Sequence, residues 1–148
     1  MPYIRRALQS EFAAITDVWE ASVRASHDFL SEDDLCALRP QILNTWLPAV
    51  QVTVCTDEKG DILGFSGVTD NKLEMLFVAP VSRGRGVGKA LLMHAVTNLA
   101  VCLVDVNEQN GHALGFYQHF GFTVFGRSPV DGQGRAYPLL HMRRKPFS

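Results

Sequence analysis

The sequence of 148 residues lacks the features that mark several protein classes. Its three cysteines, Cys36, Cys55 and Cys102, are odd in number and scattered, a spacing that suits neither a disulfide framework nor a zinc site. No apolar run approaches the roughly 18 residues that a membrane helix needs, and no apolar signal segment follows the first residues. We therefore expect a cytoplasmic protein that binds no metal and contacts no membrane.

An excess of charge of one sign is also missing. The chain has 14 basic and 15 acidic residues, a formal net charge of −1 at pH 7, so we expect no nucleic-acid partner. The length suits a single domain over residues 1–148. A domain of roughly 150 residues buries about two-thirds of its chain surface, which is enough core to fold without disulfides or a structural metal.

Hydrophobic periodicity divides the chain into helices and strands. Helical spacing is seen at Phe12, Ile15 and Trp19, whereas residues 50–54 alternate as in a strand with one buried face. The continuous apolar run at 73–79 favours a central strand that is covered on both faces. The pattern predicts helices at 11–24, 31–48, 89–99 and 113–120, and strands at 3–7, 50–54, 62–68, 73–79, 101–106, 122–125 and 137–142. This order predicts an α/β domain with a mixed sheet and helices on both faces.

Capping and breaking residues set the expected helix ends. Ser10 and Ser31 are each followed by acidic residues, so we expect them to cap the first two helices. Pro40 should kink or split the second helix, because proline has no amide hydrogen to donate. We expect Asn110 to cap the last helix and Gly121 to end it in the left-handed conformation.

Glycine is concentrated in one segment between a predicted buried strand and a predicted helix. This segment is Arg83-Gly84-Arg85-Gly86-Val87-Gly88-Lys89. Closely spaced glycines let backbone amides converge, and a helix N-terminus adds a positive partial charge, so the segment favours a bound anion. Its three cationic side chains favour a phosphate group. The alternative is a solvated, flexible basic turn.

Spacing argues against two nucleotide-binding loops. A Walker A loop needs a glycine where Arg83 stands and a serine or threonine where Ala90 stands. The dinucleotide motif G-x-G-x-x-G does not fit either, since Gly84, Gly86 and Gly88 form G-x-G-x-G. A nucleotide-binding enzyme is therefore a weak alternative.

Two other motifs fit together. The pattern Arg83-x-x-Gly86-x-Gly88, after a strand and before an apolar helix, resembles the acetyl-CoA pyrophosphate loop of the GNAT superfamily of N-acetyltransferases. About 20 residues on, Asn107 at a strand end is followed by N-x-x-A-x-x-F-Y-x-x-x-G-F, which is similar to a second GNAT signature. Residues 26–31, 106–110 and 137–140 also resemble a small bacterial YjaB-like subgroup.

The resemblance implies a single GNAT domain whose central sheet is mixed, mostly antiparallel and of about six to seven strands. It further implies that acetyl-CoA is the cosubstrate and that the fourth and fifth strands splay apart. Backbone groups of the fourth strand would bind the pantetheine and the acyl carbonyl, and the loop amides would bind the pyrophosphate. The cofactor-binding residues implied are Leu76, Phe77, Val78, Arg83, Gly84, Arg85, Gly86, Val87, Gly88, Lys89 and Asn107.

Catalytic residues are implied in the same way. Tyr117 matches the family tyrosine that protonates the departing thiolate, although its spacing also suits a core aromatic residue. Two residues are candidates for the general base. Glu74 lies on the fourth strand, and His27 lies between the first two helices. The alternatives are a solvent-facing strand residue for Glu74 and a loop-stabilising residue for His27.

The predicted function is transfer of an acetyl group from acetyl-CoA to a primary amine, by direct attack in a ternary complex. The acceptor is a small molecule or a protein, and neither charge nor motif distinguishes them. A catalytically weak or inactive CoA-binding sensor is the alternative function. The resemblance allows either a monomer or a homodimer.

Overall fold

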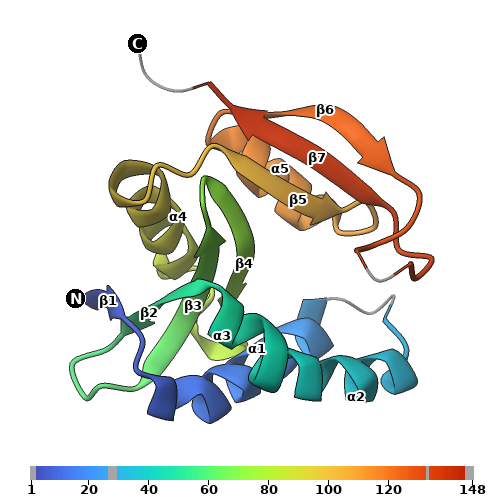
Figure 1. The fold of residues 1–148 in the computed structure, drawn as a ribbon. Coiled ribbons are helices and arrows are strands. Elements are labelled where there is room, and N and C mark those ends of the chain that lie inside the picture. Colours follow the sequence, from blue (N-terminus) through green and yellow to red (C-terminus); the bar gives the residue numbers. More distant parts are fainter. Residues whose placement is uncertain (1–2, 27–29, 133, 146–148) are drawn as a thin grey trace.

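A mixed seven-stranded sheet runs through the described part of the protein (Figure 1). The computed structural model describes residues 3–26, 30–132 and 134–145. Its strands lie in the order β1-β2-β3-β4-β5-β7-β6, and all neighbours are antiparallel except β4 and β5. The strands are β1 (Tyr3–Arg6), β2 (Gln51–Thr56), β3 (Ile62–Thr69), β4 (Lys72–Val78), β5 (Leu103–Asn107), β6 (Phe122–Ser128) and β7 (Leu139–Arg144). The predicted mixed, mostly antiparallel sheet is confirmed.

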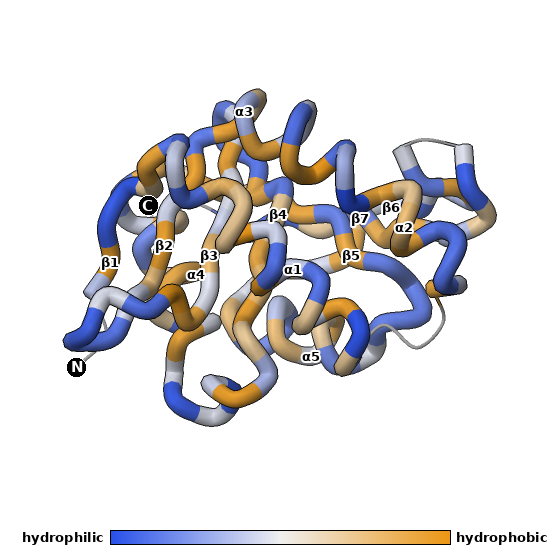
Figure 2. The backbone as a smooth tube through the Cα atoms, turned by 90° about the horizontal axis from the view of Figure 1, so that it is seen from below, coloured by the Kyte–Doolittle hydropathy of each residue, from blue (hydrophilic) through white to orange (hydrophobic). Residues whose placement is uncertain are grey.

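Helices cover both faces of this sheet, as predicted. One face carries α1 (Phe12–Ser26), α2 (Glu32–Gln41) and α3 (Leu47–Ala49), and the other carries α4 (Val87–Asn98) and α5 (Gly111–His119) (Figure 1). The structure also contains the short helical segments η1 (Gln9–Glu11), η2 (Ile42–Trp46) and η3 (Pro80–Ser82). Figure 2 shows the hydrophilic stretches mainly in the peripheral turns and the hydrophobic stretches recurring along the strands. Among the described helices, none is long and apolar enough to cross a membrane.

The first two helices begin in different ways. Before α1, the chain forms the 3₁₀ turn η1, and Glu11 Oε1 accepts a hydrogen bond of 2.9 Å from the backbone amide of Leu8. The prediction that Ser10 caps this helix is therefore wrong, because the Glu11 carboxylate satisfies an amide one turn earlier. Ser31 does cap α2, since its Oγ accepts a hydrogen bond of 3.1 Å from the amide of Asp34.

Pro40 changes the type of helix without ending it. It lies inside α2, and the chain continues as the π-helical segment η2 and then as α3. Proline removes one amide donor from the ladder, and a wider π turn accommodates such a loss. The predicted interruption is thus a local change of hydrogen bonding that keeps one long helical segment over the sheet.

Burial of two strands differs from the prediction. In β2 both faces are buried from Val52 to Thr56, because helices of both layers pack on this strand. The predicted coverage of β4 on both faces is wrong at its start, where Leu73 and Met75 are buried but Glu74 is exposed. The far half of β4 is only partly covered, because it has no pairing with β5 there. This open half lies at the functional site.

An ion pair near the N-terminus gives a prediction about acid stability. Arg5 Nη2 lies 2.7 Å from Glu11 Oε2, and the hydrogen bonds from Arg5 and then from the Leu8 amide lower the pKa of Glu11 from 4.5 to about 2. Since the folded-state pKa is depressed, the stabilisation is present above pH 4.5 and is lost as the pH falls toward 2. The Arg5 side chain is partly exposed, so we expect about 1 kcal/mol for this contribution.

Urea unfolding of the wild type and of Glu11→Gln tests this. At pH 7 the variant should be less stable by about 1 kcal/mol, and at pH 2.5 most of that difference should be gone. An equal difference at both pH values would mean that the Glu11 carboxylate charge is not what stabilises the segment.

Candidate active site between strands β4 and β5

The strands β4 and β5 pair only over their first residues. Lys72 is in register with Leu103, and Leu73 is in register with Val104. Beyond these two positions a small cavity of about 100 Å³ lies between the strands, lined by residues of β4, β5 and α5. The splay that the family resemblance implied is therefore present.

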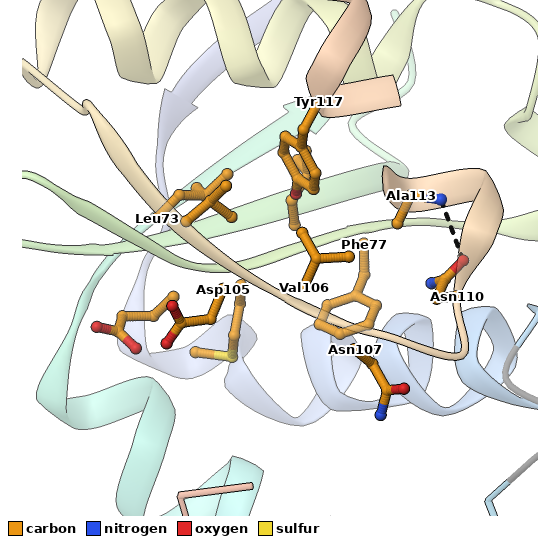
Figure 3. A pocket seen from close by; sticks show the side chains of 12 residues that line it. Leu73, Phe77, Asp105, Val106, Asn107, Asn110, Ala113 and Tyr117 are labelled. Atoms are coloured by element: carbon orange, nitrogen blue, oxygen red, sulfur yellow. Dashed lines mark hydrogen bonds between the residues drawn. The ribbon is translucent and has the colours of Figure 1, made fainter. Parts of the chain in front are cut away.

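Tyr117 points from α5 toward this cavity, as Figure 3 shows. The residue is 7% exposed, and its ring packs edge-on against Phe116 and Phe122, at centroid distances of 5.3 and 5.7 Å. Burial raises the pKa of Tyr117 above its ordinary value of 10. The residue is thus part of the hydrophobic core and also a lining residue of the cavity, and its hydroxyl stays protonated at neutral pH.

Two asparagines shape the turn that follows β5. Asn110 caps α5, since its Oδ1 accepts a hydrogen bond of 3.1 Å from the Ala113 amide. Asn107 Oδ1 accepts a hydrogen bond of 2.9 Å from the Gln109 amide, which fixes the turn at the end of the strand. Asn107 lines the central cavity from β5, and Figure 3 shows its side chain directed away from Tyr117.

A second cavity, of about 680 Å³, lies beside the glycine-rich loop. Gly84 and Gly86 have φ values of +79° and +78°, and Gly86 is the residue that precedes α4. A side chain is strained in this backbone conformation, so glycine is favoured at both positions of the turn that leads into α4. The predicted cofactor residues that line this cavity are Leu76, Phe77, Val78, Arg83, Gly84, Gly86, Val87, Gly88 and Lys89.

Of the three cationic side chains that were predicted to favour a phosphate group, two do not simply face the loop-side cavity. Arg85 is exposed and is not among the residues that line the loop-side cavity. Arg83 lines it, but its Nη2 donates a hydrogen bond of 3.2 Å to the backbone carbonyl of Ser22, which ties the loop to α1. Lys89, in the first turn of α4, is exposed beside the cavity.

A third cavity, of about 580 Å³, lies on the other side of the splayed strands, between the sheet and the layer of α1 to α3. Its apolar walls include Trp19 and Trp46. Glu74 lines it from β4, with 37% of the side chain exposed, and Lys72 Nζ lies 3.9 Å from Glu74 Oε1. The other predicted base, His27, lies outside the described residues.

Comparison with known proteins identifies this arrangement. Residues 23–144 match the family model of the acetyltransferase (GNAT) domain. The chain belongs to the GNAT family. It is an N-acetyltransferase, and solved structures with the same fold contain coenzyme A or acetyl-CoA.

Relatives of this GNAT chain match it over nearly its whole length. Peptidyl-lysine N-acetyltransferase YjaB of Salmonella typhimurium is 39% identical over 139 residues, which are 94% of this chain and 95% of the relative. The solution structure of apo-form YjaB from Escherichia coli is 36% identical, covers 99% of both chains and superposes with a TM-score of 0.90. The structure of yncA from Salmonella typhimurium with its cofactor acetyl-CoA, at 22% identity, covers 100% of this chain and 95% of that one, and shows the same fold with a TM-score of 0.68.

The described residues of this GNAT domain fit acetyl-CoA. The loop offers amides at a helix N-terminus beside cationic side chains, which suits a pyrophosphate. The loop-side cavity continues along β4 to the central cavity, with Leu76, Phe77 and Tyr117 lining both. A long ligand with a phosphate end and a thioester end matches that shape. Within the described residues, no cluster of side chains suited to a metal ion is found.

A polar network in the GNAT domain was missed by sequence reasoning. Lys72 Nζ lies 2.6 Å from Asp105 Oδ2, Asp105 Oδ1 lies 2.6 Å from His141 Nδ1, and His141 Nε2 lies 2.7 Å from Ser128 Oγ. Burial disfavours the charged forms of both Asp105 and Lys72. The hydrogen bond between the two side chains and the attraction of their opposite charges outweigh this effect of burial. The pKa of Asp105 is lowered, with help from His141, and the pKa of Lys72 is raised. The sequence feature that could have indicated this network is the presence of Asp105 and His141 in otherwise apolar strands.

Proposed function

We propose that this enzyme acetylates the ε-amine of lysine side chains in proteins or peptides, with acetyl-CoA as donor. The observation that carries the proposal is that three cavities on the two faces of the sheet share lining residues between β4 and β5. The central cavity shares Glu74, Asp105 and Asn107 with the third cavity, and it shares Leu76 and Tyr117 with the loop-side cavity. A donor that enters from the loop side and an acceptor that enters from the helix side would meet between β4 and β5.

The donor side is suited to hold acetyl-CoA along β4. When bound, acetyl-CoA supplies the acetyl group as a thioester. The amides from Arg83 to Lys89 would hold the pyrophosphate, and backbone groups of Leu76–Val78 would orient the pantetheine. Asn107 lines the central and third cavities and not the loop-side cavity, so its contact with the donor would be at the thioester end. Holding both reactants in one orientation is itself a large part of such catalysis.

The acceptor side suits a long apolar stem that ends in a cation. Trp46, Met75 and Leu139 are among its apolar lining residues. Its charged lining residues are Lys72, Glu74, Asp105 and Asp131, which sum to −2. Apolar walls around carboxylates match the butyl chain and ammonium group of lysine. The relatives named peptidyl-lysine N-acetyltransferase support the same acceptor.

Proton transfers at the two sides have separate residues. A lysine ammonium, with an ordinary pKa of about 10.4, must lose a proton before it can attack, and we assign that proton to the Glu74 carboxylate, directly or through water. On the donor side, Tyr117 Oη would give its proton to the departing thiolate. Burial keeps this hydroxyl protonated, so the proton is available at neutral pH.

Substitution of Glu74 tests the assignment of the base. We expect Glu74→Gln to lower kcat/KM for a lysine peptide about 10- to 100-fold, while the affinity for CoA stays within two-fold of wild type. Glu58→Gln, in the turn between β2 and β3, is the matched control and should retain full activity. Activity of Glu74→Gln equal to that of the control would remove Glu74 as the base.

The acceptor is tested with a panel of amines. Purified protein and acetyl-CoA are incubated separately with lysine peptides, a polyamine and a small primary amine, and both thiol release and product mass are measured. We expect the lysine peptides to be acetylated with the highest kcat/KM. Preference for another amine would overturn the lysine assignment, and CoA binding without any acetylated product would indicate the sensor function.

A further inference from the structure

We propose that His141 is a positioning residue of the acceptor site. Bonded to Ser128 and Asp105, it holds Asp105 and through it Lys72 beside Glu74, and protonation of His141 weakens the binding of a cationic acceptor. This inference rests on the proposed function, because it concerns how the same cavity recognises an amine. The inference gives a role to His141 on β7, a residue to which the proposed function assigns none.

The network connects the acceptor cavity to the far half of the sheet. Lys72 and Asp105 line the cavity, whereas His141 and Ser128 lie behind them on β7 and β6. The side chains of Asp105 and His141 are 23% and 28% exposed, so water screens the contacts only in part. A change of charge at His141 is therefore felt at the cavity.

The hydrogen bonds define the proton positions on the neutral imidazole. The ionised Asp105 carboxylate only accepts, so Nδ1 of His141 carries the hydrogen and donates it to Oδ1. Nε2 is then the acceptor for the Ser128 hydroxyl. This tautomer holds the ring on both sides and keeps Asp105 Oδ2 directed at Lys72.

The charge balance at the cavity depends on this imidazole. With His141 neutral, Lys72, Glu74, Asp105 and Asp131 sum to −2, which attracts an ammonium group. With His141 protonated, these residues and His141 together sum to −1, so the attraction is weaker.

The other described charges around His141 are accounted for on each neighbouring strand. On β6, Arg127 is paired with Glu108, at 2.5 Å. On β7 itself, Arg143 stacks over the Phe125 ring at 5.3 Å, and Arg144 Nε donates a hydrogen bond of 2.9 Å to the backbone carbonyl of Phe120. Asp105 is the group that faces the imidazole from β5.

The order Ser128, His141, Asp105 also matches the hydrogen-bond order of a nucleophilic triad. In this protein the second oxygen of the carboxylate is occupied by Lys72, and the chain of bonds ends in the acceptor cavity. The geometry therefore points to support of that cavity. A nucleophilic role would make Ser128→Ala inactive, whereas the positioning role predicts that Ser128→Ala retains turnover and loses lysine-peptide affinity by no more than His141→Ala does.

Binding to a dead-end complex isolates the effect of His141. The dissociation constant of a lysine peptide is measured for protein saturated with CoA, which carries no acetyl group, at pH 8 and pH 6. The peptide keeps its charge over this range, because a lysine amine titrates near about 10.4. We expect wild-type binding to be roughly five-fold weaker at pH 6, the effect of one unit charge several ångströms away in a partly screened site.

Two variants separate positioning from charge. His141→Asn retains an amide that can donate to Asp105 but takes up no proton, so its peptide affinity should be near that of wild type at pH 8 and unchanged at pH 6. His141→Ala should bind the peptide several-fold more weakly at both pH values, with unchanged CoA affinity. His119→Asn, at the end of α5, is the matched control and should behave as wild type.

The outcomes distinguish this proposal from the proposed function. If His141→Asn keeps the wild-type pH dependence, or if a folded His141→Ala binds like wild type, the positioning role is wrong although acetylation of lysine stands. Nitrogen NMR of the histidine ring at pH 8 adds a test independent of the acceptor, and a hydrogen on Nε2 in place of Nδ1 would overturn the role. If another amine proves to be the substrate, the same titration is made with it, and if none is acetylated both proposals fail.

Discussion

Replacing Tyr117 with phenylalanine is expected to lower kcat for acetyl transfer about 10²- to 10³-fold, with KM for acetyl-CoA within about two-fold of wild type. The substitution removes one hydroxyl and keeps the ring that packs against Phe116 and Phe122. Since burial alone accounts for the raised pKa of Tyr117, the hydroxyl is not held by a described ionisable partner, and its loss should leave the melting temperature nearly unchanged.

Steady-state kinetics at pH 7 and pH 9, with thermal unfolding of both proteins, measure this effect. Tyr3→Phe is the matched control, because Tyr3 is an exposed tyrosine on the edge strand β1. Activity of Tyr117→Phe above one-third of wild type at both pH values would show that Tyr117 is a core residue only. A loss of activity that is accompanied by a large drop in melting temperature would point to the same conclusion.

The second large effect is expected at the glycine-rich loop. Gly86→Ala should raise KM for acetyl-CoA about 10-fold or more and destabilise the protein by about 1–2 kcal/mol. Gly86 has a φ of +78° immediately before α4, so an alanine there strains the backbone or turns the amides of the helix start away from the phosphate site. The expected change in kcat is smaller, because no group at the reacting atoms is altered.

Calorimetric CoA titration and urea unfolding separate the two parts of this effect. The control is Gly115→Ala in the interior of α5, where a Cβ meets nothing within 4 Å. That change should stabilise the helix by up to about 1 kcal/mol and leave CoA affinity unchanged. CoA affinity of Gly86→Ala equal to that of the control would show that the loop amides do not hold the pyrophosphate.

Several features were predictable because they depend on neighbours in the sequence. The caps Ser31 and Asn110 bond to amides three residues later, and Gly121 has a φ of +93° after α5. The order of strands and helices followed from apolar periodicity in the same way. The spacing of the loop from Arg83 to Lys89 predicts an anion site, because such a site depends on backbone amides, and this assignment stays a prediction.

Other features depend on contacts that spacing does not report. Glu11 displaced Ser10 as the first cap because its carboxylate also pairs with Arg5. The burial of β2 on both faces and the exposure of Glu74 on β4 depend on which helices cover each strand and where pairing stops. These are properties of the assembled layers, and no local pattern in the chain encodes them.

The sequence by itself determined the family and the fold class, and it predicts the segments that are proposed to hold the donor. Only the tertiary structure decided how the reacting groups are gathered. Tyr117, Glu74 and the network from Lys72 to His141 come from α5, β4, β5 and β7, which meet because β4 and β5 pair over two positions and then separate. The physical reason is range: capping and periodicity act within a few residues, whereas a cavity and its charge balance arise between strands that are distant along the chain.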